Sequence, residues 1–145
     1  MRISDVLHGK PQGDAVVTVS PDTTVRDLIA LLDEHNIGAV IVRSDDNPVA
    51  GIVSERDVVR GLVSGLDLLD RNVSTIMTAE VQTARPEDSV HNLMKLMTEH
   101  RIRHVPVVAE GELHGIVSIG DVVKSRIGEL EFERDQLTSY VSTSQ

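Results

Sequence analysis

An internal repeat constrains this chain more than any other feature of its sequence. Residues 18–42 read TVSPDTTVRDLIALLDEHNIGAVIV, and residues 83–107 read TARPEDSVHNLMKLMTEHRIRHVPV. A fainter match precedes the two copies, with ISDVL at 3–7 against VSTIM at 73–77. Self-similarity of this length indicates two copies of one supersecondary unit that pack on each other.

Each copy is expected to form a strand, a helix, two further strands and a second helix. Apolar residues recur at helical spacing from Val25 to Leu32 and from Val90 to Met97. A proline turn and a Ser, Thr or Asp that can cap a helix stand before each of these stretches. Runs rich in β-branched residues predict the later strands at 39–42, 49–53, 105–108 and 113–117.

One copy, about 60 residues long, is too short to bury a core alone. We therefore expect an α+β fold, α/β-like in its alternation of elements, in which two β-α-β-β-α repeats pack sheet against sheet about a pseudo-two-fold axis. Such an axis generates two related clefts. The expected organisation is a first repeat at 1–63, a linker at 64–72, a second repeat at 73–128 and a C-terminal helical extension at 129–145. Three linker leucines are expected to pack against the repeats, namely Leu66, Leu68 and Leu69.

Charge and composition exclude several classes of partner. The formal net charge is -9, and the only aromatic residues are Phe132 and Tyr140. An acidic chain without stacking platforms is repelled by nucleic-acid backbones, so no nucleic-acid partner is expected. The absence of Cys removes disulfides, thiolate metal ligands and Cys nucleophiles. The N-terminal sequence has no apolar run long enough for a signal peptide or membrane span, so we expect a cytoplasmic protein without a membrane partner.

The motif Ser-x-x-Asp stands at 54–57 and again at 118–121, in each copy directly after the Gly-Ile-Val that ends a predicted strand. Its simplest interpretation is a helix N-cap with an acidic first turn. The same geometry can serve a ligand. A helix N-terminus offers free N–H groups to a phosphate, and a carboxylate can accept two hydrogen bonds from a ribose diol. Because the motif recurs at the same place in both copies, we favour the second interpretation while the first stays open.

The matched motifs, taken together, resemble a known family. They are a Thr-x-x-Pro that opens each copy, a Glu-His-x-Ile helix end, Val-Pro-Val at 105–107, and Gly-Ile-Val-Ser-x-x-Asp at 51–57 and 115–121. Over residues 1–128 the chain resembles a tandem CBS domain, named after cystathionine β-synthase. The resemblance implies regulatory binding of adenosine-containing ligands such as AMP, ADP, ATP, NAD(H) or S-adenosylmethionine, with AMP foremost and no required cofactor. It also implies a homodimer that signals to a partner protein by changing conformation.

The resemblance assigns roles to residues at matching positions. Asp57 and Asp121 would hold the ribose, and Ser54 and Ser118 would lie near phosphate. The apolar strand segments would sandwich the adenine. The first cleft is then expected to contain Thr18, Ala39, Val40, Ile41, Ser54, Arg56 and Asp57. The second is expected to contain Thr83, Arg103, His104, Val105, Pro106, Ser118, Ile119, Gly120 and Asp121.

Thr18 and Thr83 match positions where the family often places a hydroxyl near the sugar or base. An ordinary strand position explains a Thr nearly as well, because β-branched residues favour strands. Pro106 suits an edge strand, since it cannot donate to a sheet ladder. The first copy has Ile41 in place of that proline, which makes its adenine slot less certain.

Positive charge near a phosphate would come from few residues. Arg56, Arg103 and His104 are the main candidates, and Lys124 and Arg126 are weaker ones. Each could equally be a solvated surface charge. The first copy has Gly-Ala where the second has Arg-His, so the clefts should not bind alike. We expect the second cleft to accept a phosphorylated ligand more readily.

Two other functions compete with ligand sensing. Catalysis is not expected, because the sequence has no Cys nucleophile, no phosphate-binding Gly-rich loop and no motif that places a Ser-His-acid group. A dimerisation or scaffold module with empty clefts is the alternative that remains. His35 and His100 stand at predicted helix ends, where we expect a structural or C-cap role and no bound metal.

The C-terminal sequence continues the last predicted helix beyond the second repeat. Its apolar residues follow a four-three spacing that Arg134 interrupts, namely Val123, Ile127, Leu130, Leu137 and Val141. One interpretation is an amphipathic helix folded on its own core. The other, which we favour slightly, is a dimer arm or partner-docking helix, because so short a tail reaches little other core.

Overall fold

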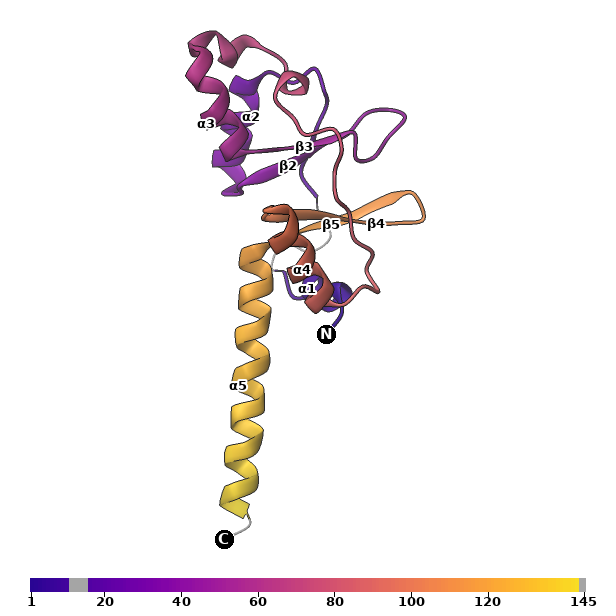
Figure 1. The fold of residues 1–145 in the computed structure, drawn as a ribbon, viewed down its shortest axis with the longest axis vertical. Coiled ribbons are helices and arrows are strands. Elements are labelled where there is room, and N and C mark those ends of the chain that lie inside the picture. The colour runs from indigo at the N-terminus through magenta and orange to yellow at the C-terminus, as the bar shows by residue number, and fades with distance from the viewer. Residues whose placement is uncertain (11–15, 144–145) are drawn as a thin grey trace.

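The computed structural model describes residues 1–10 and 16–143. Two small sheets lie face to face in the middle of the molecule, with helices on their outer sides (Figure 1). The fold is α+β, as expected, with two repeats and an extended C-terminal helix. The helices are α1 (Ile3–His8), α2 (Val25–His35), α3 (Glu55–Gly61), α4 (Val90–His100) and α5 (Ile119–Thr143). The strands are β1 (Thr18–Val19), β2 (Ala39–Val42), β3 (Gly51–Ser54), β4 (His104–Ala109) and β5 (Glu112–Ser118).

The two sheets differ at the opening strand of each repeat. In the first repeat β1 runs parallel to β2, with Thr18 opposite Ile41, and β2 runs antiparallel to β3. In the second repeat β4 and β5 form an antiparallel pair. Ahead of them, where a strand was expected, the described chain has an isolated bridge between Ala84 and Val107. The less β-branched sequence Gln-Thr-Ala there, against Val-Thr-Val in the first repeat, accounts for the shorter pairing.

Side-chain caps begin the first helix of each repeat, as the sequence predicted. The Thr24 hydroxyl accepts a hydrogen bond from the Asp27 N–H, and the Ser89 hydroxyl accepts one from the Asn92 N–H. Each cap satisfies an N–H that the helix itself leaves free. The helices end on His35 and His100, and the residue after each lies in the left-handed region. In both repeats this helix therefore begins at a side-chain N-cap and ends at a residue in the left-handed region.

Each repeat has its own apolar core beneath its sheet. The first core is formed by Val25, Leu28, Leu32, Val40, Val42, Val53, Val58, Leu68 and Val73. The second is formed by Ile3, Val6, Ala84, Val90, Leu93, Met97, Val105, Val107, Val117 and Val122. With almost no aromatic residues available, aliphatic side chains and Met97 fill both cores.

The segment that precedes each repeat packs on the other repeat. The N-terminal helix α1 packs on β5 and α5, and the Ile3 N–H donates to the carbonyl of Asp88 at 2.9 Å. In the same way, the Val73 N–H donates to the carbonyl of Thr23 at 2.8 Å. The faint match between 3–7 and 73–77 is thus a pair of exchanged segments, which the sequence comparison did not reveal.

Two glycines allow these exchanged segments to approach the sheets closely. A Cβ on Gly115 would lie 2.8 Å from a methyl group of Leu7, and one on Gly51 would lie 2.5 Å from the Met77 sulfur. These distances are shorter than van der Waals contact, so a larger residue would push the segment away. The contacts also place Leu7 and Met77 at equivalent positions about the pseudo-two-fold axis.

The linker forms two 3-10 helices, Leu62–Ser64 and Leu66–Asp70, and a third follows at Val73–Thr75. Leu68 is buried in the first core and Leu69 packs beside it, as expected. Leu66 is 76% exposed, so the prediction that it packs is wrong. In a 3-10 helix neighbouring side chains point about 120° apart, so the turn that directs Leu68 into the core directs Leu66 away from it.

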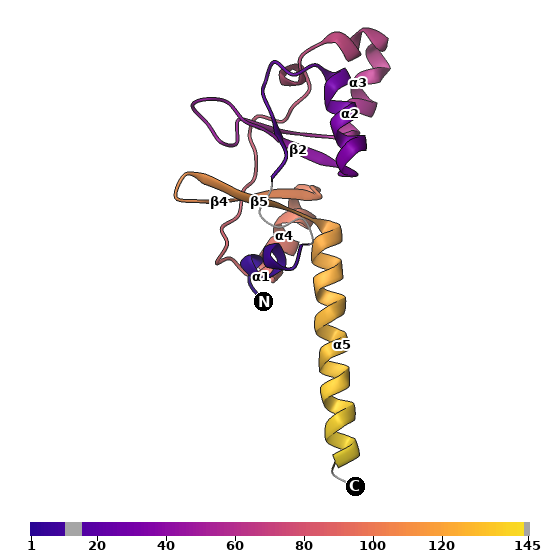
Figure 2. The ribbon, with the colours of Figure 1, turned by 180° about the vertical axis from the view of Figure 1, so that it is seen from behind.

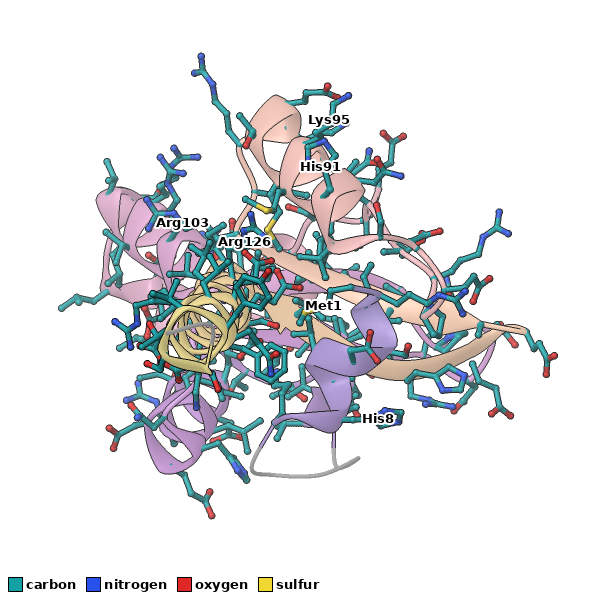
Figure 3. The ribbon with its side chains drawn as sticks, turned by 90° about the horizontal axis from the view of Figure 1, so that it is seen from below. Met1, His8, His91, Lys95, Arg103 and Arg126 are labelled. Atoms are coloured by element: carbon teal, nitrogen blue, oxygen red, sulfur yellow. The ribbon has the colours of Figure 1, made fainter. Side chains whose placement is uncertain are left out.

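Helix α5 leaves the second repeat and runs alone into solvent (Figures 1 and 2). Its base is held by α1 and α4, and the Ser125 hydroxyl contacts the Met1 sulfur. Met1 lies beside α1 (Figure 3). Further along, Leu130 is 49% exposed and Leu137 is 66% exposed. The interpretation of this tail as a helix folded on its own core is therefore wrong. No helix among the described residues is long and apolar enough to cross a membrane.

Candidate functional site

Both Ser-x-x-Asp motifs form reciprocal capping boxes where a strand passes into a helix. In the first, Oδ2 of Asp57 accepts the Ser54 N–H at 2.8 Å and the Ser54 hydroxyl at 3.1 Å. The Asp57 N–H points back to the Ser54 hydroxyl oxygen at 3.4 Å. Because this network fixes the carboxylate at the first turn of α3, the capping interpretation is correct. The network does not conflict with ligand binding, since a carboxylate has acceptor capacity on both oxygens.

The second motif repeats this geometry and adds a cation. Oδ2 of Asp121 accepts the Ser118 N–H at 2.9 Å, and the Asp121 N–H donates to the Ser118 hydroxyl at 3.1 Å. The ammonium group of Lys10 lies 3.0 Å from the same Oδ2 and donates to the carbonyl of Ile116 at 2.7 Å. Lys10 follows α1 in the chain, so the exchanged N-terminal segment brings it to the second repeat.

The pKa of Asp121 reflects two opposing effects. Burial of the carboxyl group raises its pKa, but the Ser118 N–H and the ion pair with Lys10 outweigh burial, so the pKa lies below its ordinary value. Asp121 is therefore an anion at neutral pH. Its charge is balanced by Lys10, and the pair is mostly shielded from solvent.

His104 lies where the two repeats meet. Its Nε2 would be 3.4 Å from a Cβ placed on Gly38, which belongs to the first repeat. Burial lowers its pKa, and the nearby carboxylates of Asp121 and Glu55 only partly offset that effect. His104 is therefore neutral at pH 7 and can donate or accept a hydrogen bond between the repeats. Gly38 leaves the space that the imidazole occupies.

Arg56 and Arg103 were predicted to lie in different clefts, but in the structure both line the same cleft. That cleft, of about 280 Å³, lies between α4 and the base of α5 and is lined by Arg56, Met97, Thr98, Arg101, Ile102, Arg103 and Ile119. A related cleft of about 500 Å³ lies between α2 and α3 and is lined by Ile29, Leu32, Asp33, Asn36, Ile37, Gly38, Glu55, Val58 and Val59. Neither of these two clefts is lined by Asp57 or Asp121.

The strand residues expected to sandwich an adenine are packed inside the protein. Ala39, Val40, Ile41, Val105 and Pro106 are all buried. The carbonyl of Pro106 also accepts a hydrogen bond from the N–H of Ala84 at 3.0 Å. A base therefore cannot contact these side chains unless the packing around them changes.

The remaining candidates lie at varied distances from the two capping boxes. Thr18 is half-buried in β1, whereas Thr83 is exposed. Gly120 lies in the first turn of α5, where a Cβ would be 3.6 Å from the Ser118 hydroxyl oxygen. Lys124 is exposed on α5. Arg126 pairs with Glu129 at 2.7 Å, one turn along the same helix (Figure 3 labels Arg126).

Lys10 is the residue of this site that the sequence did not single out. It lies before the first strong match of the repeat, and no local sequence pattern indicates that it forms an ion pair with Asp121. The equivalence of Leu7 with Met77 places Lys10 opposite Glu80, three residues further along each segment. The fainter match of 3–7 with 73–77 therefore indicated that Lys10 and Glu80 are equivalent, but only the fold shows that Lys10 contacts Asp121.

Comparison with known proteins identifies the family. The model of the CBS domain matches residues 12–64 and 73–128. The chain is 38% identical over 146 residues to the mitochondrial CBS-domain-containing protein CBSX3 of Arabidopsis thaliana, and the match covers 96% of this chain and 71% of that protein.

Solved structures agree with this assignment. A CBS-domain-containing protein of Agrobacterium tumefaciens superposes with a TM-score of 0.81 at 42% identity, over 87% of this chain and 99% of that one. A CBS domain protein of Pyrobaculum aerophilum, solved in complex with AMP, superposes with a TM-score of 0.73 at 34% identity, over 83% of this chain and 89% of that one. The chain belongs to the CBS domain family and is a tandem pair of CBS domains.

Proposed function

We propose that this tandem pair is a non-catalytic regulatory module that binds an adenosine-containing nucleotide, AMP foremost, at the two Ser-x-x-Asp junctions. The observation that carries the proposal is the duplicated capping box, which holds Asp57 and Asp121 in the same orientation at equivalent strand-to-helix turns. The Pyrobaculum aerophilum relative, with AMP bound, supports the choice of ligand.

The chemistry of each junction suits a nucleoside monophosphate. The carboxylate accepts hydrogen bonds from the ribose hydroxyls, and the serine and the helix N-terminus favour the negative charge of the phosphate. The second cleft has two further groups that the first lacks at the equivalent positions, His104 in place of Ala39 and Lys10 in place of Glu80. We therefore assign the tighter binding of phosphate to the second cleft.

Signalling follows from the way the repeats share their parts. The exchanged segments tie each core to the other, and His104 lies against Gly38 across the junction of the repeats. A ligand that binds one mutual arrangement of the repeats better than another shifts the population towards it. A partner protein that contacts both repeats would read that shift.

A second copy of the chain is the partner we assign to α5. The spacing places Ile127 and Arg134 at a positions and Leu130 and Leu137 at d positions of a heptad, and both leucines are exposed. In a parallel pair, Arg126 at a g position would face Glu131 of the second copy at an e position, with opposite charge. Arg134 at an a position would fix the register at some cost in stability.

Isothermal titration calorimetry tests the ligand proposal. AMP, ADP, ATP, NAD(H) and S-adenosylmethionine are titrated into the full chain and into the Asp57→Asn and Asp121→Asn variants. Asn keeps the size and much of the capping ability of Asp but loses the charge. Asp27→Asn, in the first turn of α2, is the matched control. Each site variant should lose one binding event, and the control should lose none.

Two outcomes would favour other functions. A folded chain that binds no member of the panel would instead support the scaffold alternative, in which the outer surface and α5 carry the function. Conversion of a bound nucleotide to product during the titration would show that the module is an enzyme.

A further inference from the structure

We propose that Lys10 is the phosphate-selecting residue of the second cleft, held by Asp121 in the empty protein and released to the ligand's phosphate when the ribose takes Asp121. The inference rests on the proposed function. It adds a residue from outside the repeat motif and a reason for the second cleft to prefer ligands with an anionic group at the 5′ position.

The position of Lys10 is set by the fold. Helix α1 packs on β5 through the close contact of Leu7 with Gly115, and Lys10 follows two residues after the helix ends. Its ammonium group reaches both the Asp121 carboxylate at 3.0 Å and the Ile116 carbonyl at 2.7 Å. The side chains of Lys10 and Asp121 are 29% and 24% exposed, so the pair is more shielded than a surface ion pair.

Competition for one carboxylate provides the selectivity. Oδ2 of Asp121 already accepts the Ser118 N–H and the Lys10 ammonium, so a ribose diol that engages both carboxylate oxygens shares Oδ2 with the ammonium or displaces it. A half-buried ammonium that loses its partner is costly, because desolvation is no longer offset. A 5′-phosphate at the start of α5 offers the displaced ammonium a new anion, whereas a neutral nucleoside offers none.

The first cleft provides an internal comparison. There the equivalent residue is Glu80, and no described basic residue forms an ion pair with Asp57. A ribose that binds Asp57 therefore displaces no cation. The same fold thus presents a cation to one carboxylate, and the equivalent position of the other exchanged segment holds an acid.

Calorimetric titration of AMP and adenosine separates the phosphate contribution from the nucleoside contribution. Both ligands are titrated into the full chain carrying Asp57→Asn, so that the second cleft dominates, and then into the same chain with Lys10→Met. Lys10→Arg keeps the charge, and Lys95→Met removes an exposed lysine on α4 as the matched control. A thermal melt of each variant establishes that it is folded.

Lys10→Met should weaken the affinity for AMP by about tenfold or more, which is the effect expected for loss of a charge-assisted hydrogen bond. Adenosine should bind as before or more tightly, because its ribose no longer competes with an ammonium. Lys10→Arg should keep most of the preference for AMP, and Lys95→Met should keep all of it.

Equal changes for AMP and adenosine in Lys10→Met, or an unchanged affinity for AMP, would overturn the role of Lys10 and leave the nucleotide-binding function standing. If the Asp57→Asn chain bound neither ligand while the unaltered chain bound both, the second cleft would not be the site and the role of Lys10 would fail. Absence of binding to the unaltered chain would refute the proposed function itself, and with it this inference.

Discussion

Ile3 is completely buried in the core of the second repeat, although more than 80 residues separate it from the Asp88 carbonyl that its N–H contacts. Ile3→Ala removes three heavy atoms from a packed site beside Val6. Substitutions of buried Ile by Ala typically cost about 2–5 kcal/mol. In a chain of this size that loss corresponds to a fall in melting temperature of roughly 6–15 °C.

Urea denaturation followed by far-UV circular dichroism measures the loss, with differential scanning calorimetry as a second readout. Ile29→Ala is the matched control, because Ile29 lines the open cleft between α2 and α3 and is 36% exposed. Its loss of unfolding free energy should be less than half that of Ile3→Ala. Equal losses for the two variants would refute the conclusion that the N-terminal segment is part of the second core.

Three further predictions concern pH, the first cleft and the tail. Because the pKa values of His104 and Asp121 are both lowered by folding, the unfolded chain binds more protons. The free energy of unfolding should therefore fall as the pH drops below about 6.5, where His104 of the unfolded chain gains a proton. This fall should be smaller in His104→Asn. A second fall should follow below about 3.8, where Asp121 of the unfolded chain gains a proton. Urea titrations at a series of pH values measure this, and a flat profile from pH 7 to 5 would contradict the placement of His104. Glu80→Lys should raise the ratio of AMP to adenosine affinity in an Asp121→Asn chain, measured by calorimetry, and an unchanged ratio would contradict the equivalence with Lys10. Leu137→Glu should dissociate the proposed dimer in light-scattering measurements, whereas Phe132→Glu, on the opposite face of α5, should not; a dimer in both variants would exclude α5 as its interface.

The repeat made much of the fold predictable. Helix caps, strand positions and the two Ser-x-x-Asp turns depend on short-range patterns, and these recur in both copies. Local patterns of this kind depend on a few neighbouring residues, so the structures they indicate can be predicted without knowledge of tertiary contacts. They also explain why the capping of α3 by Ser54 was predictable to the residue.

The exchange of segments was not predictable in the same way. The match of 3–7 with 73–77 shows that the segments are alike, but both cores are aliphatic and could accept either one. Which core a segment enters depends on chain direction and on close approaches such as Leu7 at Gly115. Lys10 is a consequence of that exchange, so its contact with Asp121 could not be inferred from spacing.

The exposure of Leu66 and the reduced opening strand at Ala84 have simpler causes. Apolar character alone predicts burial, but the linker turns too tightly for all of its leucines to face one side. Strand pairing at Ala84 is limited to one bridge because the segment has fewer β-branched residues than its counterpart. Tertiary geometry therefore overrode the local tendency of Leu66, whereas at Ala84 the local tendency to form a strand was itself weak.

The location of the ligand is the central claim, and a titration of the ¹⁵N-labelled chain with AMP followed by NMR tests it most directly. The account predicts the largest amide shifts at 116–121 and at Lys10, with smaller ones at 54–57. Saturable shifts confined to the cleft between α4 and α5, around Met97 and Arg101, would contradict the assignment, as would a folded chain whose spectrum AMP leaves unchanged.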